Sequence, residues 1–234
     1  MGEIVSIPTA DGSYNAYTAY PLARQGPGLL VLPEIYNSND HIRSVADRFA
    51  AEGFIALAPD VFWRLQADQY FPYTDAGQAQ ARAFNERLNV DQLMVDLGNA
   101  VQLLRANPNS SGLVGSVGFC LGGKLSYLCS ARLGVDAAVS YYGVKIEDYL
   151  EEADNVACPM VLHFAGNDPR VPPLAQAKIE HKFSGREEVE TYLYPDAEHG
   201  FNRFGYPPYH QSSAALAWQR TLELFQRILY EQEM

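Results

Sequence analysis

The sequence predicts an α/β fold in which a mostly parallel central sheet is covered by helices on both faces. Two observations carry this prediction. Short apolar runs without polar alternation recur along the 234-residue chain, as expected of strands buried on both sides. Between them lie segments with apolar residues at helical spacing. No repeat, low-complexity tract or long linker interrupts the chain, so we expect a single domain over residues 1–234.

The first half of the chain is expected to begin with a hairpin and to continue with alternating strands and helices. Ile4–Pro8 and Tyr14–Tyr20 predict two strands around an Ala-Asp-Gly turn. Gly53 follows a helical pattern and is typical of a helix end. The further expected elements are strand Gly28–Leu32, helix Asp40–Ala51, strand Phe54–Ala58, an irregular aromatic segment over residues 61–75, and helices Gly77–Arg87 and Asp91–Ala106.

The second half continues the same alternation. The expected strands are Leu113–Phe119, Ala137–Tyr142, Met160–Ala165 and Val189–Tyr194. The expected helices are Gly122–Arg132, Pro173–Phe183 and Tyr209–Tyr230. Active sites in sheets of this kind lie at the carboxyl ends of the strands, and those ends are where candidate catalytic residues are sought.

The composition excludes several classes of protein. The chain has 17 Lys and Arg against 28 Asp and Glu, and the net charge of −11 argues against a nucleic-acid binder. It still allows an anionic substrate, because a few arginines can reverse the local field in a cleft. No apolar run approaches the ~20 residues of a membrane span, and the N-terminus lacks the pattern of a signal peptide. Only three cysteines occur, which favours a reduced, cytoplasmic setting.

The strongest chemical signal is Gly118-Phe119-Cys120-Leu121-Gly122, where a strand runs directly into a helix. This is the nucleophile-elbow pattern, with Cys in the usual place of Ser. The glycines remove side chains that would clash in so tight a turn, and the helix N-terminus favours a thiolate. The backbone N–H of Leu121 would face a developing oxyanion. The alternative is a buried structural cysteine, which is how we interpret Cys129 and Cys158.

Two further strand ends carry an acid and a base. Asp168 lies in the loop after the Met160–Ala165 strand, where a carboxylate could reach a base on a neighbouring strand end, although a turn-capping Asp would look the same. His199 follows the last strand and is the candidate general base, with a surface histidine as the alternative. Asp196 and Glu198 could compete as the acid, but they are so close to His199 in sequence that contact would need an awkward bend.

The chain order nucleophile, acid, base is Cys120, Asp168, His199, which is the order found in α/β-hydrolases. The sequence contains no HExxH motif, no Cys/His pairing with zinc spacing and no Gly-rich loop of the P-loop or dinucleotide type. We therefore expect an α/β-hydrolase domain that needs neither a metal nor a cofactor.

Beyond this triad, the sequence resembles the dienelactone hydrolase (carboxymethylenebutenolidase) family, whose members are cysteine enzymes of the α/β-hydrolase fold. The resemblance covers nearly the whole chain. The segments that carry it are Pro33-Glu34-Ile35-Tyr36, Ala58-Pro59-Asp60 with Phe62-Trp63-Arg64, Gly118-Phe119-Cys120-Leu121-Gly122-Gly123, Tyr141-Tyr142-Gly143, Gly166-Asn167-Asp168 and His199-Gly200-Phe201.

The resemblance implies further roles. Glu34 matches the family glutamate that pairs with the resting thiol and takes its proton when substrate binds. The backbone N–H of Ile35 would be the second oxyanion donor beside that of Leu121. Cys120 would then open a lactone to a thioester, and water activated by His199 would hydrolyse it, with Asp168 orienting the histidine.

The family substrate carries a carboxylate held by two arginines. Arg203 matches the arginine that follows the catalytic histidine by four residues. The place of the second falls on Gln78, and Arg82, one helical turn later, would share its face and could substitute. Asn85 stands where the family has a large aromatic residue. Tyr142 follows its strand and is a further candidate substrate contact, with a structural role as the alternative.

The expected function is cysteine-dependent hydrolysis of a small, anionic lactone or ester, with no nucleic-acid or membrane partner and with the oligomeric state left open. One alternative is a broader carboxylesterase or thioesterase, favoured by the missing arginine at Gln78. Another is a ligand-binding scaffold without hydrolytic activity. An ordered nucleophile, acid and base argue against that last alternative, because a binding module needs none of them.

Overall fold

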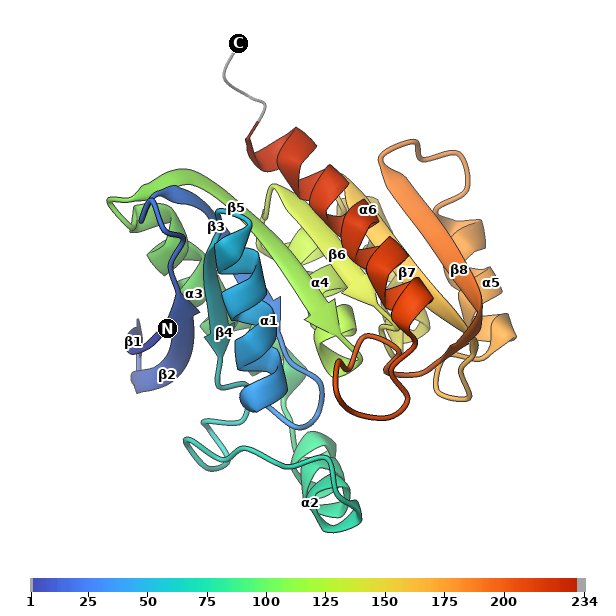
Figure 1. Ribbon diagram of the computed structural model, residues 1–234, viewed down its shortest axis with the longest axis horizontal. Coiled ribbons are helices and arrows are strands. Elements are labelled where there is room, and N and C mark those ends of the chain that lie inside the picture. Colours follow the sequence, from blue (N-terminus) through green and yellow to red (C-terminus); the bar gives the residue numbers. More distant parts are fainter. Residues whose placement is uncertain (1, 231–234) are drawn as a thin grey trace. The chain divides into compact units, whose positions relative to one another are not determined.

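The computed structural model describes residues 2–230, and the chain divides into two compact units, residues 1–115 and 116–234. Strand β5 (Ser110–Phe119) runs through the boundary between them. Figure 1 shows that both units contain strands and helices. No helix in the described part of the chain has the length and apolar character that crossing a membrane requires.

The first unit begins with the predicted hairpin, in which β1 (Glu3–Thr9) pairs with β2 (Gly12–Ala19) in antiparallel fashion. Strand β2 is also antiparallel to β4 (Ile55–Pro59), whereas β3 (Gly26–Leu32) is parallel to β4. Its strands follow the order β1-β2-β4-β3-β5. Helices α1 (Asp40–Ala51) and α3 (Val90–Ala106) pack on this sheet, and α2 (Asp75–Glu86) precedes α3.

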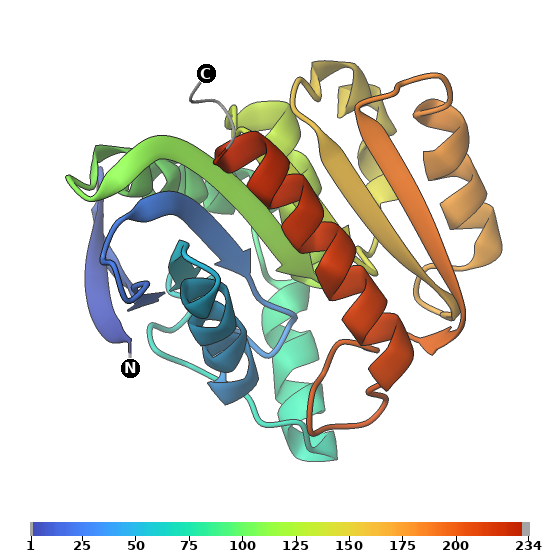
Figure 2. The same cartoon turned by 45° about the horizontal axis from the view of Figure 1, so that its top comes forward.

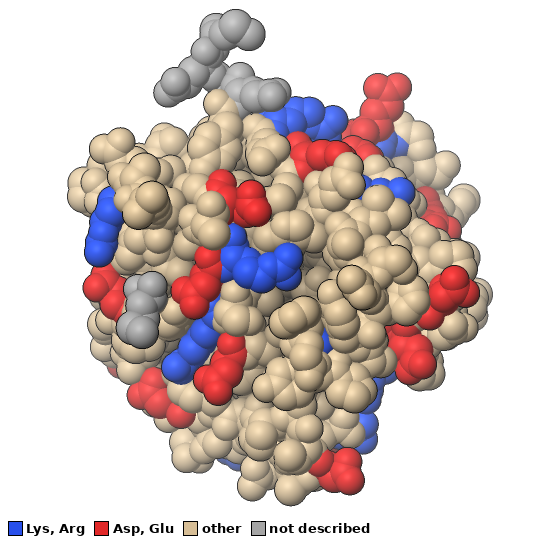
Figure 3. Space-filling view, in the orientation of Figure 1, with Lys and Arg blue, Asp and Glu red and all other residues tan. Residues whose placement is uncertain are grey.

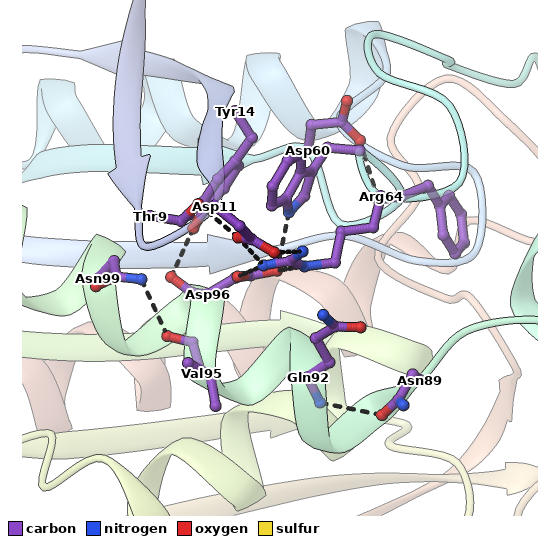
Figure 4. Close-up of polar contacts among 12 residues, drawn as sticks. Thr9, Asp11, Tyr14, Asp60, Arg64, Asn89, Gln92, Val95, Asp96 and Asn99 are labelled. Carbon is purple, nitrogen blue, oxygen red and sulfur yellow. Dashed lines mark hydrogen bonds and ion pairs between the residues drawn. The ribbon is translucent and has the colours of Figure 1, made fainter.

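The irregular segment after β4 is held by two buried carboxylates of the first unit. Asp60 accepts hydrogen bonds from the Asn37 side chain (2.6 Å) and from the backbone N–H of Phe62 (3.0 Å). Burial raises the pKa of Asp60. The guanidinium of Arg64 lies between Asp96 and Asp11, 2.7 Å from each, as Figure 4 shows. The Phe62-Trp63-Arg64 motif therefore fastens this segment to α3 and to the hairpin.

The second unit contains β6 (Ala137–Tyr141), β7 (Met160–Asn167) and β8 (Val189–Glu198), which pair in parallel with one another. Its strand order is β5-β6-β7-β8. Helix α4 (Leu121–Arg132) packs on β6 from one face of the sheet, and α6 (Gln211–Leu229) packs on β6 and β7 from the other, as Figure 2 shows. Helix α5 (Pro173–Lys182) packs on η1 (Ile146–Asn155).

Each predicted helix and strand is present, and the boundaries shift by a few residues. The largest shift is at β8, which continues to Glu198, so that His199 directly follows a strand. The 3₁₀ segment η1 was not predicted, because its acidic stretch is kinked at Tyr149 and shows no long apolar period. On the face that Figure 3 shows, Lys and Arg side chains alternate with Asp and Glu and form no continuous basic stripe.

A fully buried histidine, His163 on β7, links the elements of the second unit through side-chain hydrogen bonds. Thr221 on α6 donates its hydroxyl proton to the carbonyl of Ala217, so its oxygen can only accept from His163 Nε2 at 3.1 Å. The other ring nitrogen, Nδ1, then accepts from the Tyr194 hydroxyl at 2.9 Å. That hydroxyl in turn accepts from Arg220 at 3.2 Å. The network thus fixes His163 as a neutral imidazole with its proton on Nε2.

This burial predicts an acid-sensitive contribution to stability. Burial lowers the pKa of His163 to about 3, whereas an unfolded histidine has a pKa near 6.5. Between these values the unfolded chain binds the extra proton, so the free energy of unfolding falls as the pH falls, by about 1.4 kcal/mol per pH unit. In urea titrations between pH 6.5 and 5, we expect wild type to lose about 1.7 kcal/mol more than His163→Gln, because the unfolded histidine is already half protonated at pH 6.5. The control is the same substitution at exposed His181, His181→Gln. If the free energy of unfolding of His163→Gln changed with pH in parallel with that of wild type, this prediction would be contradicted.

Candidate active site

Cys120 occupies the turn between β5 and α4 with the backbone geometry of a nucleophile elbow. Its φ of 57° and ψ of −111° lie in a region that non-glycine residues rarely adopt. Surrounding hydrogen bonds impose this conformation. The Cys120 N–H donates to the carbonyl of Tyr141 (3.0 Å), and the Cys120 carbonyl accepts from Gly123 (3.1 Å) and Val144 (3.2 Å). The end of β6 and the first turn of α4 therefore hold the strained backbone of Cys120 in place. Cys120 is 6% exposed.

The tightness of the elbow explains its first glycine. A Cβ at Gly118 would lie 1.8 Å from the carbonyl oxygen of Gly122 and 2.8 Å from the nitrogen of Gly123. Both atoms are backbone, so neither can rotate away. Leu121 is the first residue of α4, and the first N–H groups of a helix have no partner within the helix. Its N–H is therefore suited to the predicted oxyanion role.

Asp168 and His199 meet at the ends of neighbouring parallel strands. Asp168 follows β7, and its Oδ1 accepts from the backbone N–H groups of Arg170 (2.8 Å) and Val171 (3.2 Å). Its Oδ2 lies 2.8 Å from Nδ1 of His199. Both residues are buried, whereas the competing Asp196 and Glu198 are exposed. Of the three carboxylates considered from the sequence, Asp168 is the one that contacts the histidine ring.

The contact with Asp168 leaves Nε2 as the chemically available atom of His199. Nε2 is buried and, because Nδ1 is on Asp168, it is the ring atom that can interact with the Cys120 side chain. Burial opposes protonation of the ring, but negative charge on Cys120 and the hydrogen bond to Asp168 outweigh it and raise the pKa of His199 to about 9. The electrostatics of the second unit thus favour the imidazolium form of His199.

Two further predicted residues surround the histidine. The ring of Tyr142 meets that of His199 edge to face, with centroids 5.0 Å apart. The Arg203 side chain folds back over Gly200. A Cβ built on Gly200 would lie only 2.9 Å from Cζ and from Nε of Arg203. The guanidinium is therefore next to the residue that follows His199, where it could bind an anionic group.

In the first unit, Glu34 is 1% exposed and lies just after β3. The hydroxyl of Tyr73 donates to Glu34 Oε2 at 2.8 Å. The sequence placed Tyr73 only within the irregular aromatic segment over residues 61–75. Its 39-residue separation from Glu34 carries no motif, so only the folded chain identifies this partner. Ile35, the predicted second oxyanion donor, is half-buried beside Glu34.

The place of the second family arginine is occupied by Gln78 on α2. The Gln78 side chain donates from Nε2 to the Tyr36 hydroxyl at 3.0 Å. Tyr36 packs edge to face against Tyr73 with centroids 4.5 Å apart. Arg82, the proposed substitute, is exposed on α2. Tyr73, Tyr36 and Gln78 therefore form a connected set of hydrogen-bonding and aromatic side chains that leads from α2 to Glu34.

Residues 2–230 contain no group of three or more His, Cys, Asp or Glu side chains arranged to hold a metal. The mostly parallel sheet with its N-terminal hairpin, together with the strand–turn–helix elbow at Cys120, defines an α/β-hydrolase.

Comparisons with known proteins place the chain within that class. The model of the dienelactone hydrolase family matches residues 14–229, and the chain belongs to this family. It is 31% identical to the carboxymethylenebutenolidase of Pseudomonas putida over 225 residues, which is 95% of each chain. It is also 31% identical to that of Pseudomonas sp. strain P51 over 218 residues, covering 93% of this chain and 91% of the relative. The chain is thus a hydrolase of the ester and lactone class.

Solved structures agree on the fold. A structure from Klebsiella pneumoniae subsp. pneumoniae MGH 78578 aligns with a TM-score of 0.85 at 24% identity, over 97% of this chain and 98% of that chain. The dienelactone hydrolase of Anabaena variabilis ATCC 29413 aligns with a TM-score of 0.72 at 20% identity, over 98% of both chains.

Proposed function

We propose that the chain hydrolyses a small carboxylated lactone or ester through a thioester on Cys120. The observation that carries this proposal is the 2.8 Å contact between His199 Nδ1 and Asp168, on the unit that also holds Cys120 in a nucleophile elbow. A carboxylate on Nδ1 orients the ring and supports its protonated form, as in other nucleophile–base–acid triads. The buried position of both side chains strengthens that interaction.

The reaction proceeds in two stages. The Cys120 sulfur attacks the carbonyl carbon, the ring C–O bond breaks, and the enolate oxygen leaves with the electron pair and takes the proton of the His199 imidazolium, which becomes neutral. His199 then removes a proton from water, the resulting hydroxide attacks the thioester carbon, and the carboxylic product departs as the sulfur regains its electrons. Glu34 accepts the thiol proton before the attack, and the N–H groups of Leu121 and Ile35 stabilise the oxyanion. No cofactor takes part in these steps.

Arg203 is proposed to bind the substrate carboxylate. The position of its guanidinium over Gly200, next to His199, supports this role. We expect Arg203→Ala to raise KM for the parent dienelactone about tenfold or more, because a charge-assisted contact to the substrate is lost. A neutral p-nitrophenyl ester of similar size should keep its KM. Equal effects on both substrates would remove Arg203 from carboxylate binding.

Arg82→Ala, measured with the same two substrates, tests the second arginine. A selective rise in KM for the lactone would support Arg82 as the substitute clamp. The alternative function is a broader esterase or thioesterase, which Gln78 and its hydrogen bond to Tyr36 favour. Efficient, Cys120-dependent cleavage of the neutral ester with little lactone turnover would select that alternative. We further propose a reduced, cytoplasmic setting, which the three free cysteines support.

A further inference from the structure

A buried lysine lies in the first turn of the helix that begins at the elbow. Lys124 is only 7% exposed, although its side chain carries an amine that is normally solvated. Its ammonium lies 5.7 Å from the centre of the Tyr149 ring on η1. It forms no ion pair with a carboxylate in the part of the chain that the structure describes. The mechanism above assigns this residue no role.

The position of Lys124 relative to Cys120 follows from the helix. The Lys124 N–H donates to the Cys120 carbonyl at 3.3 Å, so the two residues are one helical turn apart. The charged groups that act on Lys124 come from three elements: Cys120 at the start of α4, Lys145 in the loop after β6 and Asp148 on η1. Lys145 and Asp148 are both exposed, where solvent screens their charges. Cys120 is the buried member of this set.

Burying an ammonium without an anion is unfavourable, because the charge loses its hydration. Burial therefore lowers the pKa of Lys124, with repulsion from Lys145 in the same direction, whereas negative charge on Cys120 favours the ammonium. A thiolate on Cys120 and an ammonium on Lys124 thus stabilise each other. The ring of Tyr149 adds a cation–π contact that a neutral side chain would not gain.

We propose that Lys124 is a positioning residue that stabilises the thiolate form of Cys120 from the first turn of α4, in addition to His199. The inference rests on the proposed function, since it requires Cys120 to act as a thiolate nucleophile. Lys124 acts through the field at the sulfur and touches neither substrate nor the reacting carbon. Lys124 adds a second positive charge to that of His199, and it lies on the helix that begins at the elbow.

The test is the rate at which iodoacetamide alkylates Cys120, measured by peptide-resolved mass spectrometry so that Cys129 and Cys158 are counted separately. At pH 6, where Lys124 carries its charge, we expect Lys124→Met to slow alkylation about threefold to tenfold. At pH 10, where the lowered pKa of Lys124 favours its neutral form, the two rates should move closer together. Lys124→Arg keeps the charge and should behave like wild type. Lys124→Gln gives a second neutral variant should Lys124→Met fail to fold.

Lys145→Met is the matched control, because it removes an exposed positive charge near Lys124 and should change the rate less than twofold. Equal rates for Lys124→Met and wild type at pH 6 would overturn the proposal. A loss of the same size at pH 6 and pH 10 would also overturn it, since it would show a packing effect. Failure of the proposed function looks different, because Cys120→Ala would then keep its hydrolytic activity.

Discussion

Replacing Cys120 by alanine is expected to lower kcat for ester and lactone hydrolysis by about 10⁴-fold or more, because the covalent pathway loses its nucleophile. The substitution removes one sulfur atom and leaves the strained turn with the same backbone requirement. We therefore expect the variant to fold, and equal unfolding midpoints for variant and wild type would establish that. The measurement is turnover of the parent dienelactone and of a neutral p-nitrophenyl ester, with enzyme at concentrations high enough to detect residual rates.

The other two cysteines provide matched controls. Cys129 is completely buried in the middle of α4, and Cys158 precedes β7. Burial raises the pKa of Cys158 to about 12 and that of Cys129 further still, so neither forms a thiolate at neutral pH. Cys129→Ala and Cys158→Ala should keep kcat within about twofold of wild type, apart from any loss of folded protein. Activity that survives in Cys120→Ala would overturn the proposed mechanism.

Gly118→Ala is expected to have the largest effect on stability. The new Cβ would lie 1.8 Å from the Gly122 oxygen and 2.1 Å from the Gly122 carbonyl carbon. Relief would require the end of β5 and the start of α4 to move apart, in a turn that already holds Cys120 at positive φ. We expect a loss of about 3 kcal/mol or more in the free energy of unfolding, or failure to fold.

The control variant, Gly134→Ala, separates the steric clash at Gly118 from the general cost of replacing a glycine by alanine. Gly134, just after α4, also has a positive φ (61°), but nothing lies within 4 Å of its Cβ position. Gly134→Ala should therefore cost only about 1 kcal/mol of backbone strain. Urea unfolding of both variants gives the comparison. Losses of similar size in the two variants would mean that the elbow can relax around an added methyl group.

The sequence was most informative where the physical cause is local. Helix α1 was predicted over Asp40–Ala51 because Ile42, Val45 and Phe49 lie on one face, and the structure has the same bounds, with the Asn39 side chain as N-cap. The elbow was predicted because a strand, two glycines and a helix follow one another without a gap. The η1 segment escaped prediction because its short, kinked path leaves no periodic pattern.

Contacts between distant residues of the candidate site could not be predicted from the local sequence. Three carboxylates, Asp168, Asp196 and Glu198, were considered as the partner of His199. Their closeness to His199 in sequence counted against Asp196 and Glu198, but only the pairing of β7 with β8 brings the Asp168 carboxylate to Nδ1. In the same way, the buried surroundings of Lys124 come from η1, which follows it by more than twenty residues.

The sequence by itself determined the α/β fold and predicted the elbow at Cys120 and the order of the proposed acid and base, because these depend on periodicity and on contiguous residues. The tertiary structure decided which side chains meet. It brought Asp168 to His199, Tyr73 to Glu34 and Thr221 to His163, over separations of 31, 39 and 58 residues. Contacts of this kind depend on strand pairing and helix packing, and these give no signal in the spacing of residues along one chain.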